Sequence, residues 1–195
     1  MVLTVALPRA VVRPPRTAQV IPLRIRMPFS NIIAVSPDGR LKWRGRPYRC
    51  ALGRAGVAVT KREGDGATPM GCFSLRRVFY RADRLTPPRT GLKTDATSPT
   101  DGWCDDPRDE RYNQFVTLPH PASAETLWRD DSLYDIVVVL GFNDAPAIPG
   151  CGSAIFLHVA SGDYEPTAGC VAVARDDLLQ ILEHCSGDTR LCILG

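Results

Sequence analysis

The chain has 195 residues, of which 44% are hydrophobic, and a formal net charge of +3 at pH 7, values typical of one well-buried globular domain. Although 21 of its 24 basic residues are arginine, no dense basic run with interleaved aromatic residues occurs, which argues against nucleic acid as a partner. No stretch approaches the roughly 20 apolar residues that span a bilayer, so we expect no membrane span, and we expect a monomer.

The first 29 residues are rich in proline and arginine and contain no acidic residue before Met27, which is itself an alternative start. We expect a solvated basic tail or a lead-in strand over residues 1–29. The apolar run at residues 1–8 is too short for a signal-peptide core and follows no basic residue, so no export signal is recognised. Residues 30–195 are predicted to form the domain.

Short β runs separated by turn signals begin at residue 31. Asn31–Ser36 and Leu41–Gly45 flank a Pro37-Asp38-Gly39 turn and predict a hairpin. The next predicted strands are a second pair, Tyr48–Leu52 with Gly56–Thr60, and then Phe73–Tyr80.

The middle of the chain is less regular. Residues 84–113, rich in Pro, Thr and Asp, are predicted to be a long loop that borders the functional site, because long loops in compact domains usually carry function. Ser123–Arg129 is predicted to form one or two helical turns capped by Ser123.

The last third contains the most regular patterns. Tyr134–Phe142 and Ser153–Ala160 are apolar, β-branched runs that predict buried central strands. One helix is predicted, because Asp176 and Asp177 are placed for its first turn and Leu178, Leu179 and Leu182 recur at helical spacing. Ser186-Gly187 is expected to end the helix, and Arg190–Leu194 is predicted to form a last strand. About nine or ten strands and one helix predict a mainly β sandwich or barrel-like domain.

Seven cysteines form an odd set without a CxxC pair, at positions 50, 72, 104, 151, 170, 185 and 192. We therefore expect no disulfide scaffold and at least one free thiol. The only Cys and His close in sequence at a potential metal site are the adjacent His184 and Cys185, so we expect neither a metal nor a cofactor.

One candidate catalytic pair stands out. A predicted strand ends near His158, and a polar loop leads through Thr167-Ala168-Gly169-Cys170 into the next predicted strand. A thiol needs a nearby base, and an imidazolium partner would lower the pKa of the Cys170 thiol. The backbone amides of Gly169 and Cys170 could then stabilise an oxyanion.

Spacing alone leaves alternatives open. His158 could be a satisfied core histidine and Cys170 a structural strand residue, as in a binding module without turnover. The adjacent Asp105 and Asp106 suggest an acid/base pair of the glycosidase kind, but adjacent loop carboxylates are more often turn formers.

Three separated segments resemble the YkuD-type L,D-transpeptidases, in their small bacterial branch. Gly152–His158 followed by Pro166–Val173 resembles the family's His, loop and Ser/Thr-His-Gly-Cys motif. Thr68–Phe73 resembles its Thr-Pro-x-Gly-x-Phe turn. Further similarity lies in Lys61–Gly66, Trp103–Pro107 and Tyr134-Asp135, so the resemblance covers roughly residues 30–195.

The resemblance implies a β-sandwich or barrel of two mixed sheets with one helix, and a catalytic domain over residues 30–195. It implies a cysteine L,D-transpeptidase acting on peptidoglycan stem peptides in the cell envelope or periplasm. Cys170 would be the nucleophile, His158 the base, the Val159 carbonyl the group that orients the imidazole, and the Gly169 amide part of the oxyanion hole.

Two departures affect the expected product. The family's His before the Gly is Ala168 here, and its polar residue two positions after the Cys is Ala172. We therefore expect non-standard 1,3 cross-links rather than 3,3; the alternative on the same acyl-enzyme is an L,D-carboxypeptidase or D-amino acid exchange. The predicted substrate-binding residues are Thr167, Arg175, Tyr164, Trp103, Asp105 and Tyr112, with Asp163 as a further compensating contact.

Overall fold

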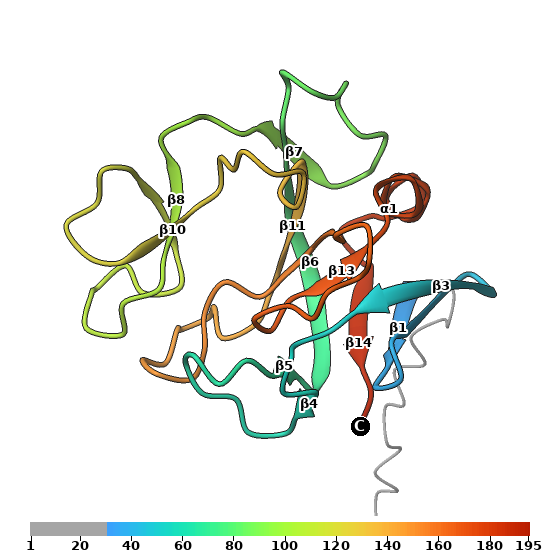
Figure 1. Ribbon diagram of the computed structural model, residues 1–195, viewed down its shortest axis with the longest axis horizontal. Helices are drawn as coiled ribbons and strands as arrows, with labels where there is room; N and C mark the ends of the chain where they lie inside the picture. The colour runs from blue at the N-terminus through green and yellow to red at the C-terminus, as the bar shows by residue number, and fades with distance from the viewer. Residues whose placement is uncertain (1–30) are drawn as a thin grey trace, which may run out of the picture.

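The computed structural model describes residues 31–195, which form fourteen strands and one helix (Figure 1). The predicted tail at residues 1–29 lies outside the described residues. The strands are β1 (Ile32–Ser36), β2 (Arg40–Trp43), β3 (Arg46–Ala51), β4 (Val57–Ala58), β5 (Thr68–Pro69), β6 (Gly71–Tyr80), β7 (Lys93–Ala96), β8 (Asp101–Cys104), β9 (Phe115–Thr117), β10 (Ala124–Thr126), β11 (Ile136–Leu140), β12 (Phe156–Val159), β13 (Val171–Val173) and β14 (Arg190–Ile193), and the helix is α1 (Arg175–Leu182).

Two mixed sheets share two strands and close on each other. One sheet has the order β3-β2-β1-β14-β6, and the other has the order β3-β13-β12-β11-β6 with β7 added beside β6. β6 can serve both sheets because its first residues pair with β14 and its later residues pair with β11. The predicted mainly β architecture of two mixed sheets is therefore confirmed.

A smaller antiparallel sheet, in the order β10-β8-β9, lies beside the ring of larger sheets (Figure 1). The small sheet can pack there because β11 is apolar on both faces, and all five residues of β11 are buried. Ile136, Val138 and Leu140 face the main core, while Val137 and Val139 face a second core that includes Trp103 of β8. Alternate side chains of a strand point to opposite faces, so a continuous apolar run supplies both cores.

The helix α1 closes one end of the main core. Leu178, Ile181 and Leu182 are fully buried, and two acidic residues occupy its first turn as predicted. Burying each of these side chains stabilises the fold by about 1.5–3 kcal/mol. Leu179, one of the three leucines from which the helix was predicted, is only partly buried, whereas Ile181 is fully buried.

Three predictions of local structure are wrong. The predicted helical turns at Ser123–Arg129 are instead β10, which pairs with β8 through Ala124↔Cys104 and Glu125↔Trp103. The segment at 56–60 does not pair with β3; Val57 pairs with Thr68 of β5, and β3 pairs with β2 and β13. In each case long-range strand pairing overrides the local signal.

The third error concerns residues 84–113, which are not one loop. They contain β7, which pairs in parallel with the end of β6, and β8, the central strand of the small sheet. The strand count exceeds the predicted nine or ten for the same reason, since strands of two to four residues are too short to show a period of two.

One disulfide joins Cys72 to Cys192, directly opposite each other in the β6–β14 pair. The bridge was not expected, because 120 residues separate the two cysteines in the sequence. If a bridge acts mainly by restricting the unfolded chain, a loop of this length contributes roughly 4–5 kcal/mol. The other five cysteines are free: Cys50, Cys104, Cys151, Cys170 and Cys185.

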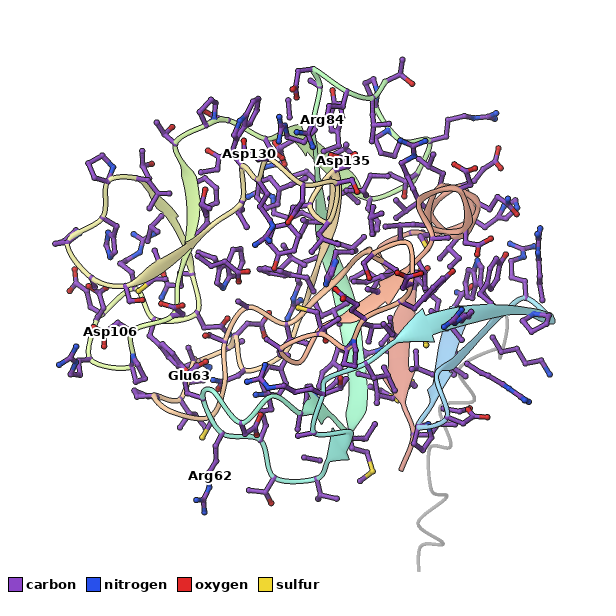
Figure 2. The ribbon with its side chains drawn as sticks, viewed as in Figure 1. Arg62, Glu63, Arg84, Asp106, Asp130 and Asp135 are labelled. Atoms are coloured by element: carbon purple, nitrogen blue, oxygen red, sulfur yellow. A yellow bond between two sulfur atoms is a disulfide. The ribbon has the colours of Figure 1, made fainter. Side chains whose placement is uncertain are left out.

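A buried ion pair anchors the chain that leads into β11. Asp135 is 3% exposed, and its carboxylate accepts a hydrogen bond of 2.7 Å from Arg84, which also donates to the carbonyl oxygen of Asp130 (Figure 2). Because an unpaired buried charge is costly, Arg84 fixes the start of the strand that backs the site described below. Within residues 31–195, no helix has the length and apolar character needed to cross a bilayer.

Candidate active site

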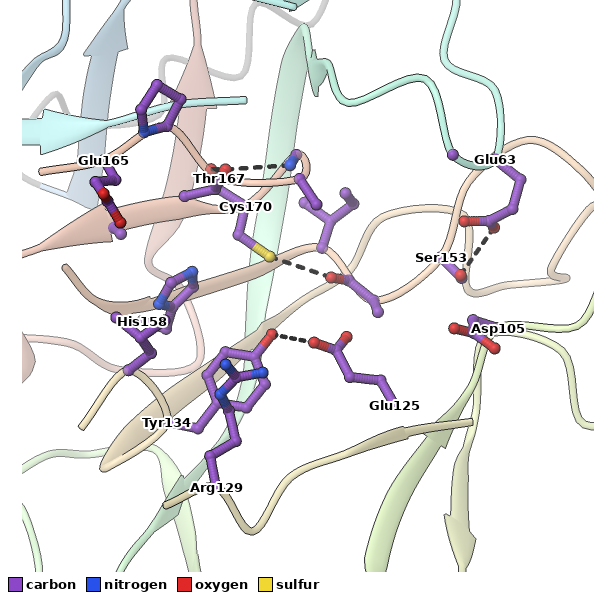
Figure 3. A pocket seen from close by; sticks show the side chains of 18 of the residues that line it. Glu63, Asp105, Glu125, Arg129, Tyr134, Ser153, His158, Glu165, Thr167 and Cys170 are labelled. Carbon is purple, nitrogen blue, oxygen red and sulfur yellow. Dashed lines mark hydrogen bonds between the residues drawn. The ribbon is translucent and has the colours of Figure 1, made fainter. Parts of the chain in front are cut away.

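A pocket of about 560 Å³ opens on the face of the second core, next to the small sheet. Strands β10, β12 and β13 supply its walls, together with the loops around residues 61–64, 129–134, 153–155 and 161–170. The side chains that carry chemistry are Lys61, Glu63, Asp105, Glu125, Arg129, Tyr134, Ser153, His158, Glu165, Thr167 and Cys170 (Figure 3).

The pairing of β12 with β13 brings Cys170 and His158 into this pocket. The two strands run parallel, with His158 opposite Ala172. Cys170 precedes Ala172 by two residues, so a strand's period of two puts the thiol on the same face as the imidazole. His158, Cys170 and Ala172 all line the pocket, as the sequence analysis predicted for the first two.

The Cys170 thiol is a neutral group in this structure. Its Sγ donates a hydrogen bond to the Ala154 carbonyl oxygen at 3.2 Å and accepts one from the Phe156 N–H at 3.3 Å. Cys170 is 7% exposed, and burial raises the pKa of its thiol to about 12. The prediction that this pKa would be lowered is wrong, because loss of hydration outweighs every favourable charge near the sulfur.

His158 is neutral as well. It is 5% exposed, and burial lowers the pKa of its imidazole to about 4. Its Nδ1 lies 2.9 Å from the Val159 carbonyl oxygen, and since a carbonyl can only accept, Nδ1 carries the hydrogen. This leaves the lone pair of Nε2 available as a base. The ring is oriented by the Val159 carbonyl oxygen, the group expected to do so.

The aromatic ring of Tyr134 holds the other side of the imidazole. The two rings meet edge to face with centroids 5.2 Å apart, and the Tyr134 hydroxyl donates to Glu125 Oε1 at 2.6 Å (Figure 3). Among residues 31–195, no hydrogen bond links the imidazole to Cys170 Sγ, whose hydrogen is directed at Ala154. The thiol and the base thus share one pocket without forming an ion pair.

The turn before Cys170 is fixed by Thr167. Its Oγ1 donates to the Cys170 carbonyl oxygen at 2.7 Å and accepts the Gly169 N–H at 3.1 Å. The predicted oxyanion amide of Gly169 is therefore already engaged, and the predicted substrate contact of Thr167 is an internal clamp. Gly169 has a φ of +146°, and a Cβ there would lie 2.9 Å from the Ala67 carbonyl oxygen, so only glycine fits.

Three carboxylates form a wall of the pocket: Glu63, Asp105 and Glu125 (Figure 3). Glu63 accepts hydrogen bonds from Tyr112 and, at 2.8 Å, from Ser153. Burial raises the pKa of Glu125, although the hydrogen bond from Tyr134 opposes this. Within the described chain, the buried Oδ1 of Asp105 has no hydrogen-bond partner.

Two cations also reach the pocket, and both are held by neighbouring carboxylates. Lys61 Nζ donates to Asp65 Oδ1 at 2.6 Å, and Arg129 donates to Asp131 at 2.6 Å while lying over the Tyr134 ring. Their charges are thus partly neutralised, which leaves the carboxylate wall as the main charged feature that faces free space.

Four predicted substrate contacts lie outside the pocket lining. Trp103 is buried and donates from Nε1 to Asn113 at 2.9 Å, and Tyr112 is buried behind Glu63. Arg175, at the start of α1, and Tyr164, whose ring lies against the Arg49 guanidinium, both line a different hollow. The further contact Asp163 offers its carbonyl oxygen to Arg49 at 3.4 Å. Of residues 84–113, Asp105 alone lines the pocket.

Several lining residues were missed as site residues, chiefly Lys61, Glu63, Glu125 and Tyr134. Glu63 and Tyr134 lie in segments that resemble the family, and this resemblance could have marked them as site residues. Glu125 lies in the segment expected to be helical, and only its pairing opposite Trp103 brings it to the pocket.

The chain matches one known protein family over most of its length. The model of the YkuD family, the L,D-transpeptidase catalytic domain, matches residues 30–193. A search of curated proteins finds no match. An L,D-transpeptidase from Mycobacterium smegmatis aligns with a TM-score of 0.42 and 11% identity, covering 85% of this chain and 59% of that one.

Two further solved structures are similar at the same low level. L,D-transpeptidase 1 from Mycobacterium tuberculosis has a TM-score of 0.41 and 11% identity over 86% of this chain and 60% of that one. The helical cell shape determining protein Pgp2 from Campylobacter jejuni has a TM-score of 0.34 and 15% identity over 83% of this chain and 46% of that one. The chain thus spans 60% or less of the length of each of these proteins.

Proposed function

The chain belongs to the YkuD family of L,D-transpeptidase catalytic domains, and on that premise we propose that it is a cysteine acyltransferase acting on peptidoglycan stem peptides. One observation carries the proposal: the Cys170 thiol and the unprotonated Nε2 of His158 line the same pocket, on one face of adjacent parallel strands. A nucleophile and an oriented base in a shared cavity are the minimum for acyl transfer.

Acylation begins from a neutral pair. Cys170 Sγ attacks the carbonyl carbon at the L-centre of the third stem residue, diaminopimelate, while the thiol proton moves to His158 Nε2. Because burial disfavours both thiolate and imidazolium, the proton is transferred as the C–S bond forms. The tetrahedral intermediate then breaks its C–N bond, and His158 gives the proton to the departing amine of D-alanine.

The charges that develop in this step have partners. The imidazolium is stabilised by the Val159 carbonyl, which already accepts the Nδ1 hydrogen at 2.9 Å. The oxyanion is assigned to the backbone amides of Cys170 and Gly169. Gly169 can contribute only if its N–H turns from Thr167 Oγ1 toward the oxyanion, so substrate binding must shift the Thr167 clamp.

Deacylation decides between transfer and hydrolysis. An amine acceptor approaches as an ammonium ion, and the wall of Glu63, Asp105 and Glu125 attracts its positive charge. Water is neutral and is not attracted in this way. The wall therefore favours transfer to an amine over the L,D-carboxypeptidase reaction. The ammonium ion loses one proton to solvent and becomes a neutral amine, which attacks the thioester carbonyl carbon. His158 takes the second amine proton during this attack and returns it to Cys170 Sγ as the C–S bond breaks, so the amide product leaves and the neutral pair is restored.

The link type follows from two small side chains. Ala168 and Ala172 replace polar residues of the family and both line the pocket. With these polar contacts missing, the acceptor is positioned by the carboxylate wall instead, and we keep the expectation of 1,3 rather than 3,3 links. Its substrate gives the protein a location in the cell envelope.

The experiment is incubation of the purified protein with disaccharide-tetrapeptide, followed by mass spectrometry of protein and products. We expect a covalent adduct on Cys170 and a cross-linked product. Cys170→Ala should abolish the adduct, and His158→Ala should slow its formation by about 10²- to 10⁴-fold. A Cys50→Ser variant, which changes a free thiol that does not line this pocket, controls for general thiol reactivity. An adduct that persists in Cys170→Ala would refute the proposal.

A further inference from the structure

A second cluster of reactive side chains lies in the small sheet and its loops. Cys104 ends β8, Asp109 lies in the loop that follows, and His120 lies three residues after β9. Their Sγ, carboxylate oxygen and imidazole nitrogen all lie within 4.8 Å of one another. None of the three lines the pocket of Cys170. Asp106, labelled in Figure 2, marks the loop that carries Asp109.

The imidazole nitrogen of this cluster has no hydrogen-bond partner. His120 Nε2 is buried and lies 3.3 Å from Asp109 Oδ2, yet no hydrogen bond with acceptable geometry forms among the described residues. A nitrogen lone pair that faces a carboxylate oxygen is unfavourable unless something positive lies between them. Buried polar atoms are almost always satisfied, so this nitrogen points to a missing partner.

The surrounding chain holds the ligand atoms in place. Cys104 is fully buried, and its backbone is bonded on both sides, to Gln114 and to Asn113. Asp109 Oδ1 accepts the Arg111 N–H at 2.7 Å, which leaves Oδ2 turned toward His120. Two of the three ligands, Cys104 and Asp109, are thus held in place before any ion arrives, as a binding site for a small ion needs.

The donor set selects the ion. A thiolate sulfur, an imidazole nitrogen and a carboxylate oxygen together suit Zn²⁺ and its neighbours, whereas Mg²⁺ and Ca²⁺ prefer oxygen alone. We propose that Cys104, Asp109 and His120 bind a divalent transition-metal ion of the zinc type, with water as the fourth ligand. No metal was expected from the sequence, because these ligands come from three separate positions without a recognisable spacing.

The ion would stabilise the part of the molecule that carries the carboxylate wall. Cys104 directly precedes Asp105 and pairs with Ala124, the neighbour of Glu125. A metal bridge from β8 to the two loops holds Asp105 and Glu125 in position against the pocket. The role is structural, because the cluster does not line the catalytic cavity, and it stands whether or not the acyl transfer proposed above is correct.

The test uses the full chain, freed of metal with a chelator and titrated with Co²⁺ and Zn²⁺. Cobalt bound to a thiolate gives a near-ultraviolet charge-transfer band, so binding is read without any enzyme assay. We expect one equivalent of Co²⁺, a band that Zn²⁺ displaces, and a higher melting temperature when Zn²⁺ is bound. Cys104→Ser should abolish the band, and His120→Gln should weaken Co²⁺ binding at least tenfold.

Matched controls separate this site from the other thiols. Cys50→Ser and Cys185→Ser change buried free cysteines elsewhere and should leave the band intact. If Cys104→Ser fails to fold, His120→Gln and Asp109→Asn still test the site, because both side chains are partly exposed. The proposal is overturned if the chain gives no band, if the band survives in the folded variants, or if it disappears only in Cys170→Ala.

Discussion

The thiol of Cys170 donates its hydrogen to the carbonyl oxygen of Ala154, 3.2 Å away, rather than to His158. Ala154 can offer its carbonyl there because its backbone adopts a left-handed conformation, with a φ of +51°. This contact and the burial of both side chains keep the resting pair neutral. The predictions below depend on that state.

The first prediction concerns alkylation of Cys170 by iodoacetamide. Only the thiolate reacts, and burial raises the pKa of this thiol to about 12. Labelling should therefore be slow at pH 7 and should keep accelerating beyond pH 9. Peptide mapping by mass spectrometry distinguishes Cys170 from the partly exposed Cys151. A rate that levels off near neutral pH would mean that an ion pair forms after all.

The second prediction is the acid limb of kcat/KM. His158 must be unprotonated to accept the thiol proton, and burial lowers its pKa to about 4. Activity should therefore hold as the pH falls from 7 to 5 and decline only near pH 4. Melting curves at each pH separate titration from unfolding. An acid limb near 6.5, the ordinary value for histidine, would contradict the burial of this base.

The third prediction is the pH dependence of stability. The unfolded His158 takes up its proton near pH 6.5 and the folded one only near pH 4, so the unfolded state binds more protons in this window. The stabilisation is full above pH 6.5 and falls as the pH is lowered toward 4, by about 3 kcal/mol from this residue. Denaturant unfolding at pH 7 and 4.5 measures the fall.

A side chain that cannot titrate serves as the comparison. His158→Gln should lose about 2.4 kcal/mol less than the wild type between the two pH values, whatever its absolute stability. Equal losses in the two proteins would show that His158 does not cause the effect.

The fourth prediction compares two glycines. Gly169→Ala would force a Cβ to within 2.9 Å of the Ala67 carbonyl oxygen at a φ of +146°, which costs about 1–3 kcal/mol and displaces the adjacent Cys170. We expect a lower melting temperature and a loss in kcat/KM of about 10²-fold. Gly162→Ala meets no atom within 4 Å and should behave like the wild type. Equal behaviour of the two variants would exclude a tight turn at Gly169.

The fifth prediction concerns the choice of acceptor. Glu125→Gln and Asp105→Asn keep the shape of the wall but remove one negative charge each. The ratio of amine transfer to hydrolysis should fall about tenfold in each variant, since a hydrogen bond to a charged group contributes about 1.5–3 kcal/mol. Product analysis by chromatography measures the ratio. Asp188→Asn changes an exposed carboxylate and is the control. If the ratio is unchanged in all three variants, the carboxylate wall takes no part in acceptor binding.

Much of the site could be predicted from residues that are close in sequence. His158, the turn at Thr167–Cys170 and the Val159 carbonyl lie within one strand–loop–strand segment, and parallel pairing brings them together. The carboxylate wall could not be predicted, because Glu63 and Glu125 reach the pocket only through the folding of distant segments. Trp103 and Tyr112 were predicted to contact substrate but are buried behind the site, because a sequence does not reveal toward which side an aromatic side chain packs.

The sequence by itself determined the mainly β character, the single helix and the pair of Cys170 and His158, because alternation, helical spacing and a local motif are written within short windows. Tertiary structure alone decided the closure of the two sheets through β6, the Cys72–Cys192 bridge and the neutral state of Cys170 and His158. The physical reason is that strand pairing and burial depend on what lies across space, and burial sets whether a thiol and an imidazole carry charge.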